Sequence, residues 1–170
     1  MPDPRPVVVA LALGGNQGPV EQILSRALRQ LEASLGPLRV ASLYRGRPVS
    51  PVPQPDFLNT AAVAHAALPA DAVLALAKAL ELAAGRRRGA RFGPRPLDID
   101  LLVHGDLTAD FPELTVPHPR LRERRFVLEP LAEIAPDLAV PPDGARVADL
   151  LARLGEPRGD GRLERIAWET

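Results

Sequence analysis

The sequence predicts an α+β protein in which helices pack on a mostly antiparallel sheet. Three observations indicate this class: residues 7–13 form an apolar run typical of a buried strand, a segment with helical spacing follows, and strand-like and helix-like segments then alternate. The resulting order, β-α-β-β-α-β, is that of a ferredoxin-like sandwich with its helices on one face of the sheet. With 170 residues, the chain is expected to form a single domain over residues 1–170.

The first half of the chain holds three of the predicted strands and two predicted helices. In the order β-α-β-β-α they are expected at residues 7–13, 20–35, 38–45, 57–67 and 70–84. A glycine-rich turn follows the first strand, Gly36 before Pro37 ends the first helix, and Gly85 can cap the second. Residues 46–55 carry four prolines and are therefore expected to be a loop.

The second half begins with a strand and continues with shorter elements. Strands are expected at 97–104, 114–116 and 163–168, and helices at 126–134 and 146–154. Pro130 is expected to disturb the first turns of its helix, because proline lacks an amide hydrogen. The stretch Pro141-Pro142-Asp143-Gly144 is expected to be a turn within one domain.

Composition argues against several classes of function. The formal net charge is +0, so no overall field attracts nucleic acid or an anionic membrane. Lys78 is the only lysine, and nine arginines lie within residues 86–95 and 120–125. The chain has no cysteine, which excludes disulfides and thiolate metal sites. Because residues 1–6 lack the layout of a signal peptide and the apolar run at 7–13 is too short to span a bilayer, we expect a cytoplasmic protein.

Asp98 and Asp100 are the strongest signal for chemistry. Side chains alternate across a strand, so the two carboxylates share one face, and Leu97, Ile99 and Leu101 share the other. Carboxylates this close repel each other unless a cation lies between them. Mg²⁺ prefers oxygen ligands of this kind, so the pair is predicted to bind Mg²⁺.

An arginine-rich segment, residues 85–95, lies directly before the aspartates. Its arginines are Arg86, Arg87, Arg88, Arg91 and Arg95. A run of charge is commonly only a solvated face, but arginine makes two-pronged contacts with phosphate oxygens, and metal-binding acids follow at once. We therefore expect a loop that closes over a polyphosphate.

His118 lies between two prolines and beside the second arginine cluster. The turn fixes its side chain, and we expect a cationic imidazole that donates a hydrogen bond to a phosphate. The alternative is that His118 only orders the turn.

Three other features have competing interpretations. The run Gly14-Gly15-Asn16-Gln17-Gly18 lacks the Gly-Lys-Ser/Thr of a phosphate-binding loop and is interpreted as a tight strand-to-helix turn that needs the φ freedom of glycine. Phe57 could stack on a flat heteroaromatic ligand while Asn59 supplies a donor and an acceptor to its edge. The equal alternative is that Phe57 is a core residue and Asn59 caps a turn. The predicted helix at 70–84 is almost wholly apolar, and Glu81 is interpreted as part of its solvent-exposed side.

Together these motifs resemble a known family. The matching segments run in order through nearly the whole chain: Leu13-Gly14-Gly15-Asn16, Ser42-Leu43-Tyr44-Arg45, Gln54-Pro55-Asp56-Phe57-Leu58-Asn59, Arg91-Phe92-Gly93-Pro94-Arg95-Pro96-Leu97-Asp98-Ile99-Asp100, and Leu114-Thr115-Val116-Pro117-His118-Pro119 continuing to Arg124 and Phe126-Val127-Leu128. The chain is similar to the 6-hydroxymethyl-7,8-dihydropterin pyrophosphokinase family of folate biosynthesis. The resemblance implies Mg²⁺-dependent transfer of a pyrophosphoryl group from ATP to the hydroxymethyl oxygen of the pterin, with AMP as the leaving group.

The resemblance also implies a role for each site residue. In this family two aspartates hold two Mg²⁺ ions, which places the metal ligands at Asp98 and Asp100. Arg86 and Arg95 would be catalytic residues that steady the transferring phosphates. The ATP-binding residues would be Arg88, Thr115, His118 and Arg124, and the pterin-binding residues would be Val49, Phe57, Asn59 and Phe126. The expected partners are the two small-molecule substrates, with no nucleic acid and no membrane, and the protein is expected to be a monomer.

Three positions depart from the family's pattern. Phe57 stands where tyrosine is common, which leaves stacking intact, and Phe92 stands where tryptophan is common. The arginine loop is one residue shorter than in well-known members, and Gly89 falls near the place of a frequent lysine.

Two other functions stay open on the sequence. A nucleic-acid-binding module of ferredoxin-like fold is opposed by the zero net charge and by the lack of an aromatic pair beside basic residues on a central strand. Another Mg²⁺-dependent phosphotransferase on the same fold would differ in its product, releasing ADP where the pyrophosphokinase releases AMP.

Overall fold

A computed structural model describes residues 4–48, 50–86 and 93–169. Its strands and helices are, in chain order, β1 (Val7–Gly15), α1 (Val20–Leu35), β2 (Arg39–Val40), β3 (Leu43–Gly46), β4 (Phe57–Ala66), α2 (Ala70–Ala83), β5 (Asp98–His104), β6 (Ala109–Phe111), β7 (Leu114–Val116), α3 (Arg125–Ile134), β8 (Ala139–Val140), β9 (Ala145–Arg146), α4 (Val147–Arg153) and β10 (Glu164–Ile166).

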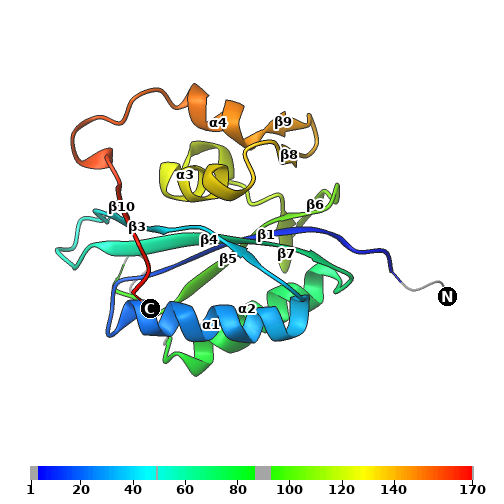
Figure 1. The fold of residues 1–170 in the computed structure, drawn as a ribbon, viewed down its shortest axis with the longest axis horizontal. Helices are drawn as coiled ribbons and strands as arrows, with labels where there is room; N and C mark the ends of the chain where they lie inside the picture. Colours follow the sequence, from blue (N-terminus) through cyan, green and yellow to red (C-terminus); the bar gives the residue numbers. More distant parts are fainter. Residues whose placement is uncertain (1–3, 49, 87–92, 170) are drawn as a thin grey trace.

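The main sheet is built around β1. Its strands lie in the order β10-β3-β4-β1-β5, with β2 also paired to β4, and the pairing is antiparallel throughout (Figure 1). The hairpins β6–β7 and β8–β9 form two small additional sheets. The strands β1, β3, β4 and β5, with α1 and α2 between them, have the connectivity of a ferredoxin-like sandwich, which confirms the predicted α+β fold.

Helices cover both faces of the sheet, whereas the sequence interpretation placed them on one face. α1 and α2 lie on one face, and α3 and α4 lie on the other (Figure 1). β1 shows the reason: Val9, Leu11 and Leu13 pack toward α1 and α2, and Ala10 and Ala12 pack toward α3. A strand that is buried on both faces has apolar residues on both, which accounts for its unbroken apolar run.

The strand expected at 38–45 is divided into β2 and β3. Both pieces pair with β4, in registers that differ by one residue. The break lies at Ala41, whose carbonyl accepts hydrogen bonds from Thr60 Oγ1 at 3.1 Å and Trp168 Nε1 at 2.8 Å. A bulge of this kind changes the direction in which the following side chains point. Here Tyr44 points toward α3, where its hydroxyl donates a hydrogen bond to Glu133.

The C-terminal part differs from expectation in detail. Pro130 lies in the middle of α3 without interrupting it, although a proline there cannot donate the hydrogen bond to the carbonyl of Phe126. The hairpin β8–β9 was not anticipated, although its connection contains the expected turn at 141–144. None of the helices in the described part of the chain has both the length and the apolar character to cross a bilayer.

Candidate active site

The face of the sheet beneath α3 carries four of the predicted site residues, Phe57, Asn59, Asp98 and Asp100. Asn59 on β4 and Asp98 on β5 both lie directly opposite Gly14 on β1, one on each side of it. Directly opposed residues project from the same face, so Asn59 and Asp98 are separated by two inter-strand spacings, about 10 Å. Asp100 lies in the next row, opposite Ala12. The structure thus places both aspartates on one face, as the alternation of the strand predicted.

Gly14 and Gly15 belong to β1 and do not form the turn expected from the sequence. Neither has a positive φ, so conformational freedom is not what requires glycine here. Glycine is required at both positions because neighbouring atoms approach the backbone closely. A Cβ on Gly14 would overlap Asn59 Oδ1, and a Cβ on Gly15 would lie 2.5 Å from the carbonyl oxygen of Pro96. Gly14 therefore leaves no side chain between Asn59 and Asp98.

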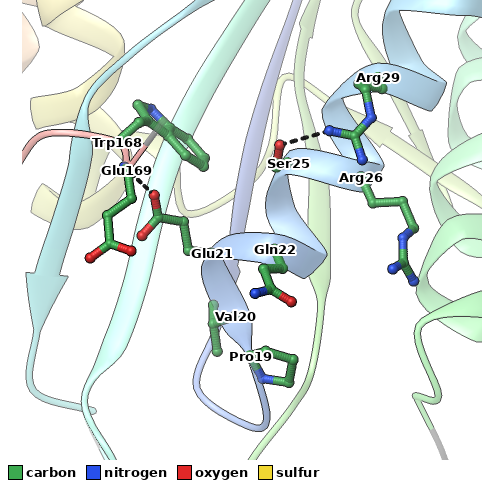
Figure 2. A pocket seen from close by; sticks show the side chains of 9 residues that line it. All are labelled: Pro19, Val20, Glu21, Gln22, Ser25, Arg26, Arg29, Trp168 and Glu169. Carbon is green, nitrogen blue, oxygen red and sulfur yellow. Dashed lines mark hydrogen bonds between the residues drawn. The ribbon is translucent and has the colours of Figure 1, made fainter.

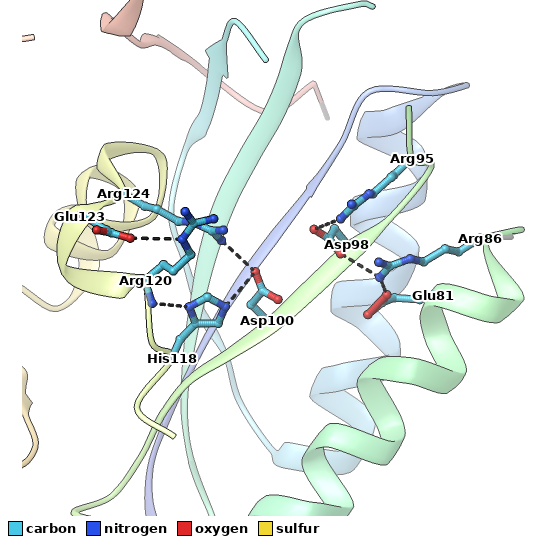
Figure 3. Close-up of polar contacts among 9 residues, drawn as sticks. All are labelled: Glu81, Arg86, Arg95, Asp98, Asp100, His118, Arg120, Glu123 and Arg124. Atoms are coloured by element: carbon cyan, nitrogen blue, oxygen red, sulfur yellow. Dashed lines mark hydrogen bonds and ion pairs between the residues drawn. The ribbon is translucent and has the colours of Figure 1, made fainter. Parts of the chain in front are cut away.

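Asp98 is held by the two arginines that the resemblance assigns to catalysis. Arg86 Nη1 donates to Asp98 Oδ1 at 2.8 Å, and Arg95 Nη1 donates to Oδ2 at 3.2 Å (Figure 3). The three side chains are all about one-third exposed or slightly less. Each carboxylate oxygen therefore has a cationic partner that stays within reach of solvent, where a phosphate could also bind.

Glu81 on α2 completes this charged group, and the interpretation of Glu81 as solvent-exposed was wrong. Glu81 is 7% exposed and forms an ion pair with Arg86 (Figure 3). The buried face of α2 consists of Ala70, Val73, Ala77 and Glu81. Residues at this spacing share one side of a helix, so the sequence did contain a signal that Glu81 lies inward.

Arg86→Ala should lower stability as well as activity. The substitution leaves the buried Glu81 carboxylate without its cation, which should reduce the free energy of unfolding by about 1–3 kcal/mol. A second change, Glu81→Leu in the Arg86→Ala background, should recover most of that loss, because an apolar residue needs no partner there. Urea unfolding of the single and double variants measures this, and equal stability of the two variants would contradict the pairing.

Asp100 faces a second pair of basic side chains, His118 and Arg124. His118 Nε2 lies 3.8 Å and Arg124 Nη1 lies 3.9 Å from Asp100 Oδ2 (Figure 3). The pKa of Asp100 is raised, first by burial and then by the negative charge of Asp98. The two cationic contacts are longer than hydrogen bonds, so they offset this effect only in part.

The surroundings of His118 disfavour the cationic form that the sequence led us to expect. Burial lowers the pKa of His118, and the attraction of Asp100 opposes this only partly. Its Nδ1 accepts the backbone N–H of Arg120 at 3.2 Å, which assigns the proton of the neutral ring to Nε2. Nε2 faces Asp100, so neutral His118 still presents one hydrogen-bond donor to the site.

The carboxylate pair suits Mg²⁺. Burial and mutual repulsion both disfavour a charged Asp100 beside Asp98, and a divalent cation would relieve both. Across residues 4–48, 50–86 and 93–169, no group of three or more His, Cys, Asp or Glu side chains forms a metal cage. Mg²⁺ needs none, since it commonly binds through one or two carboxylates and completes its shell with water and substrate phosphates.

Two aromatic residues approach the same face from different elements. Phe57 on β4 and Phe126 on α3 are both half-buried, and α3 packs against β4. Phe57 and Asn59 are in phase with the buried Ala61, which packs toward α3. The guanidinium carbon of Arg124 lies 5.4 Å from the centroid of the Phe126 ring, a cation–π distance. Arg124 thus bridges the aromatic part of the site and Asp100.

The remaining predicted residues are less informative. Thr115 lies on β7 beside β5, and its hydroxyl donates to the carbonyl of Phe111 at 3.2 Å. Val49 and Arg88 lie outside the described residues, as do the other residues of the segment 87–92.

Asn16 connects the two segments that flank the site, a role that sequence reasoning missed. Its Nδ2 donates to Gln54 Oε1 at 2.8 Å and to the carbonyl of Pro55 at 2.9 Å. Its Oδ1 accepts the backbone N–H of Arg95 at 2.8 Å, and its own amide donates to the Arg95 carbonyl. Asn16 is 5% exposed, so this buried side chain joins the proline-rich loop to the segment that carries a catalytic arginine.

A cleft of about 560 Å³ lies elsewhere, between the start of α1 and the C-terminal segment. Figure 2 shows its lining, with Glu21 and Ser25 on the helix and Trp168 opposite them. None of the predicted site residues contributes to it. The charged and aromatic face beneath α3 is therefore the better candidate for the active site, because it brings together groups that recognise phosphate, metal and a flat ring.

Comparisons of the sequence with known proteins all point to one family. Residues 10–136 match the family model of 7,8-dihydro-6-hydroxymethylpterin-pyrophosphokinase (HPPK). The chain is 42% identical over 147 residues to the 2-amino-4-hydroxy-6-hydroxymethyldihydropteridine pyrophosphokinase of Pseudomonas aeruginosa, covering 85% of this chain and 90% of the relative. It is 40% identical over 146 residues to the enzyme of the same name from Synechocystis sp., covering 85% and 74% respectively.

The fold is also found in solved structures. The crystal structure of wild-type Plasmodium falciparum HPPK-DHPS with pteroate aligns with a TM-score of 0.66 at 15% sequence identity, over 88% of this chain. The alignment covers 42% of the Plasmodium chain, so this protein spans about two-fifths of that longer one. At this identity the likeness concerns the fold.

Proposed function

The chain belongs to the 7,8-dihydro-6-hydroxymethylpterin-pyrophosphokinase family, and we propose that it transfers the pyrophosphoryl group of ATP to 6-hydroxymethyl-7,8-dihydropterin in folate biosynthesis. One observation carries the proposal. Asn59 and Asp98 flank Gly14 on the face beneath α3, so a group that recognises a heterocycle lies about 10 Å from a carboxylate pair surrounded by arginines.

The reaction forms one bond and breaks one bond. The hydroxymethyl oxygen of the pterin attacks the β-phosphorus of ATP in line, and the bond from that phosphorus to the oxygen of the α-phosphate breaks to release AMP. The hydroxyl proton leaves to solvent, and we assign no residue as a general base. Catalysis then consists mainly of positioning the two substrates and neutralising the charge of the phosphates, because phosphoryl transfer requires little covalent chemistry from the protein.

Asp98 and Asp100 would hold two Mg²⁺ ions, which when bound supply positive charge that neutralises the phosphate oxygens. Arg86 and Arg95 would bind the oxygens on which charge builds during transfer. The hydrogen bonds that both guanidinium groups donate to Asp98 position them beside the proposed metal ligands.

ATP would be held by four residues, one of them in the arginine-rich segment. They are Arg88, Thr115, His118 and Arg124. His118 contributes its Nε2–H as a neutral donor, and Arg124 contributes a fixed positive charge.

The pterin would lie between β4 and α3. Phe57 on β4 and Phe126 on α3 would stack on the ring, and Asn59 would present both a donor and an acceptor to its edge. Val49, in the proline-rich segment, is the remaining proposed contact. We further propose that residues 1–170 act as a single domain, and that the protein is a cytoplasmic monomer.

The reaction products test this function directly. Incubation with ATP, Mg²⁺ and 6-hydroxymethyl-7,8-dihydropterin should yield AMP and the pterin pyrophosphate in equal amounts, as measured by nucleotide chromatography and mass spectrometry. Omission of the pterin should stop AMP formation, because its hydroxymethyl oxygen is the proposed acceptor of the pyrophosphoryl group. Formation of ADP in place of AMP would show a different phosphotransferase.

A further inference from the structure

A hydrogen-bonded cluster outside the proposed substrate contacts joins α3 to the sheet. Glu133, near the end of α3, accepts hydrogen bonds from Tyr44 Oη at 2.7 Å, from the Ser42 amide at 3.0 Å and from Ser42 Oγ at 3.2 Å. Arg165 Nε on β10 lies 3.4 Å from the same carboxylate. We call these four residues the Glu133 anchor. The Glu133 side chain is 19% exposed, whereas that of Arg165 is exposed, so the carboxylate lies mostly inside the protein with Arg165 on its solvent side.

The anchor acts on the side of α3 that carries the proposed pterin contact. Glu133 follows Phe126 by seven residues, which is close to two helical turns and about 10 Å along the axis. Residues at this spacing project from the same side of a helix. Fixing Glu133 on the sheet therefore also sets which way Phe126 points and how far it stands from β4.

The other end of the anchor adjoins the proposed pterin contact on β4. Tyr44 lies directly opposite Asn59 in the β3–β4 pair. Opposed residues have Cβ atoms about 5 Å apart and project from one face. The same hydrogen bond, from Tyr44 to Glu133, therefore connects the strand row that holds Asn59 with the helix that holds Phe126.

The chemistry of the anchor requires a carboxylate. Burial alone would raise the pKa of Glu133, but the hydrogen bonds from Tyr44 and Ser42 outweigh this and the pKa is lowered. An ionised carboxylate only accepts hydrogen bonds, and all the groups directed at Glu133 are donors. A glutamine would turn an NH₂ group toward at least one of these donors, so the match is specific to charge as well as to shape.

We propose that Glu133 is a positioning residue for the pterin: through Tyr44 and Ser42 it sets the separation between Phe126 on α3 and the Phe57–Asn59 segment of β4. This inference rests on the proposed function, because the pterin site is part of that proposal. Glu133 does not touch the substrate, and its effect passes through α3.

Binding measurements on matched variants test the role of Glu133. The dissociation constants of the pterin, with an unhydrolysable ATP analogue and Mg²⁺ present, and of the nucleotide alone are measured by calorimetry for Glu133→Gln and Tyr44→Phe. Glu129→Gln is the control, since Glu129 lies one turn earlier on α3 and contacts only Arg125 among the ion pairs of the described residues, at 3.9 Å. We expect the pterin to bind Glu133→Gln about tenfold more weakly. Tyr44→Phe should show a smaller loss, and the affinity for the nucleotide should hardly change.

The outcomes separate positioning from general stability. Weaker pterin binding in both anchor variants, with the control unchanged, supports the proposal. Unchanged pterin binding, or equal losses for pterin and nucleotide, overturns it, even if the melting temperature falls. If Glu133→Gln does not fold, Tyr44→Phe alone decides, because it removes a single hydroxyl. A failure of the unaltered protein to bind the pterin would overturn the proposed function, whereas equal binding by the unaltered and anchor-variant proteins would overturn only this inference.

Discussion

Asp100→Ala should reduce the rate of AMP formation by at least about 100-fold, the scale seen when one group that stabilises transition-state charge is removed. Asp100 lies on the same face as Asp98, and its removal would leave Asp98, which already accepts hydrogen bonds from two arginines, as the one carboxylate for the two proposed Mg²⁺ ions. The measurement is the rate of AMP release at saturating ATP and pterin, over a range of Mg²⁺ concentrations. Normal activity with normal Mg²⁺ dependence would contradict the assignment of the metal site.

Removal of the Asp100 carboxylate should not unfold the protein. Burial and the charge of Asp98 both disfavour the ionised Asp100 side chain, and its contacts with His118 and Arg124 are long. We therefore expect Asp100→Asn, which keeps the shape, to melt at the same temperature as the unaltered protein or higher, as is common when a functional charge is removed. Asp106→Ala is the matched control, because Asp106 is exposed just beyond the same strand and should retain activity within about twofold.

Much of the fold was predictable because its main signals are local. The apolar run at 7–13, the helical spacing that follows, and the alternation around Asp98 and Asp100 each depend on short stretches of sequence, and each is found in the structure. The aspartate pair is the clearest case. A strand has a period of two, so residues two apart share a face whatever packs against it.

What escaped prediction depends on contacts between distant segments. The bulge at Ala41 is stabilised by Trp168, more than a hundred residues away, and the position of α3 and α4 depends on how the far side of the sheet is filled. The inward position of Glu81 was present in its spacing but is meaningful only once Arg86 is known to lie beside it. Likewise, glycine at position 14 is explained by Asn59 on the neighbouring strand, and its own neighbours in sequence give no sign of this.

Gly14→Ala should therefore impair pterin binding selectively. The new Cβ would overlap Asn59 Oδ1 and lie 3.2 Å from the carbonyl oxygen of Leu58, so the Asn59 amide must move away from the position that serves the ring edge. Loss of the proposed hydrogen bonds between Asn59 and the pterin in a partly buried site costs about 1–3 kcal/mol. This corresponds to a rise of about 5- to 150-fold in the dissociation constant of the pterin.

A matched glycine in open space separates this effect from a general sensitivity to alanine. Gly161 lies in a 3₁₀ turn without a positive φ, and a Cβ there would meet nothing within 4 Å, so Gly161→Ala should bind the pterin normally. Calorimetric titration of both variants with pterin and with nucleotide provides the comparison. Gly14→Ala should lose affinity for the pterin and keep its affinity for the nucleotide, because His118 and Arg124 contact Asp100, which lies opposite Ala12, whereas Asn59 lies opposite Gly14 itself. Retention of full pterin affinity in Gly14→Ala would show that the ring does not depend on Asn59 and that the pterin site must be sought elsewhere on the sheet.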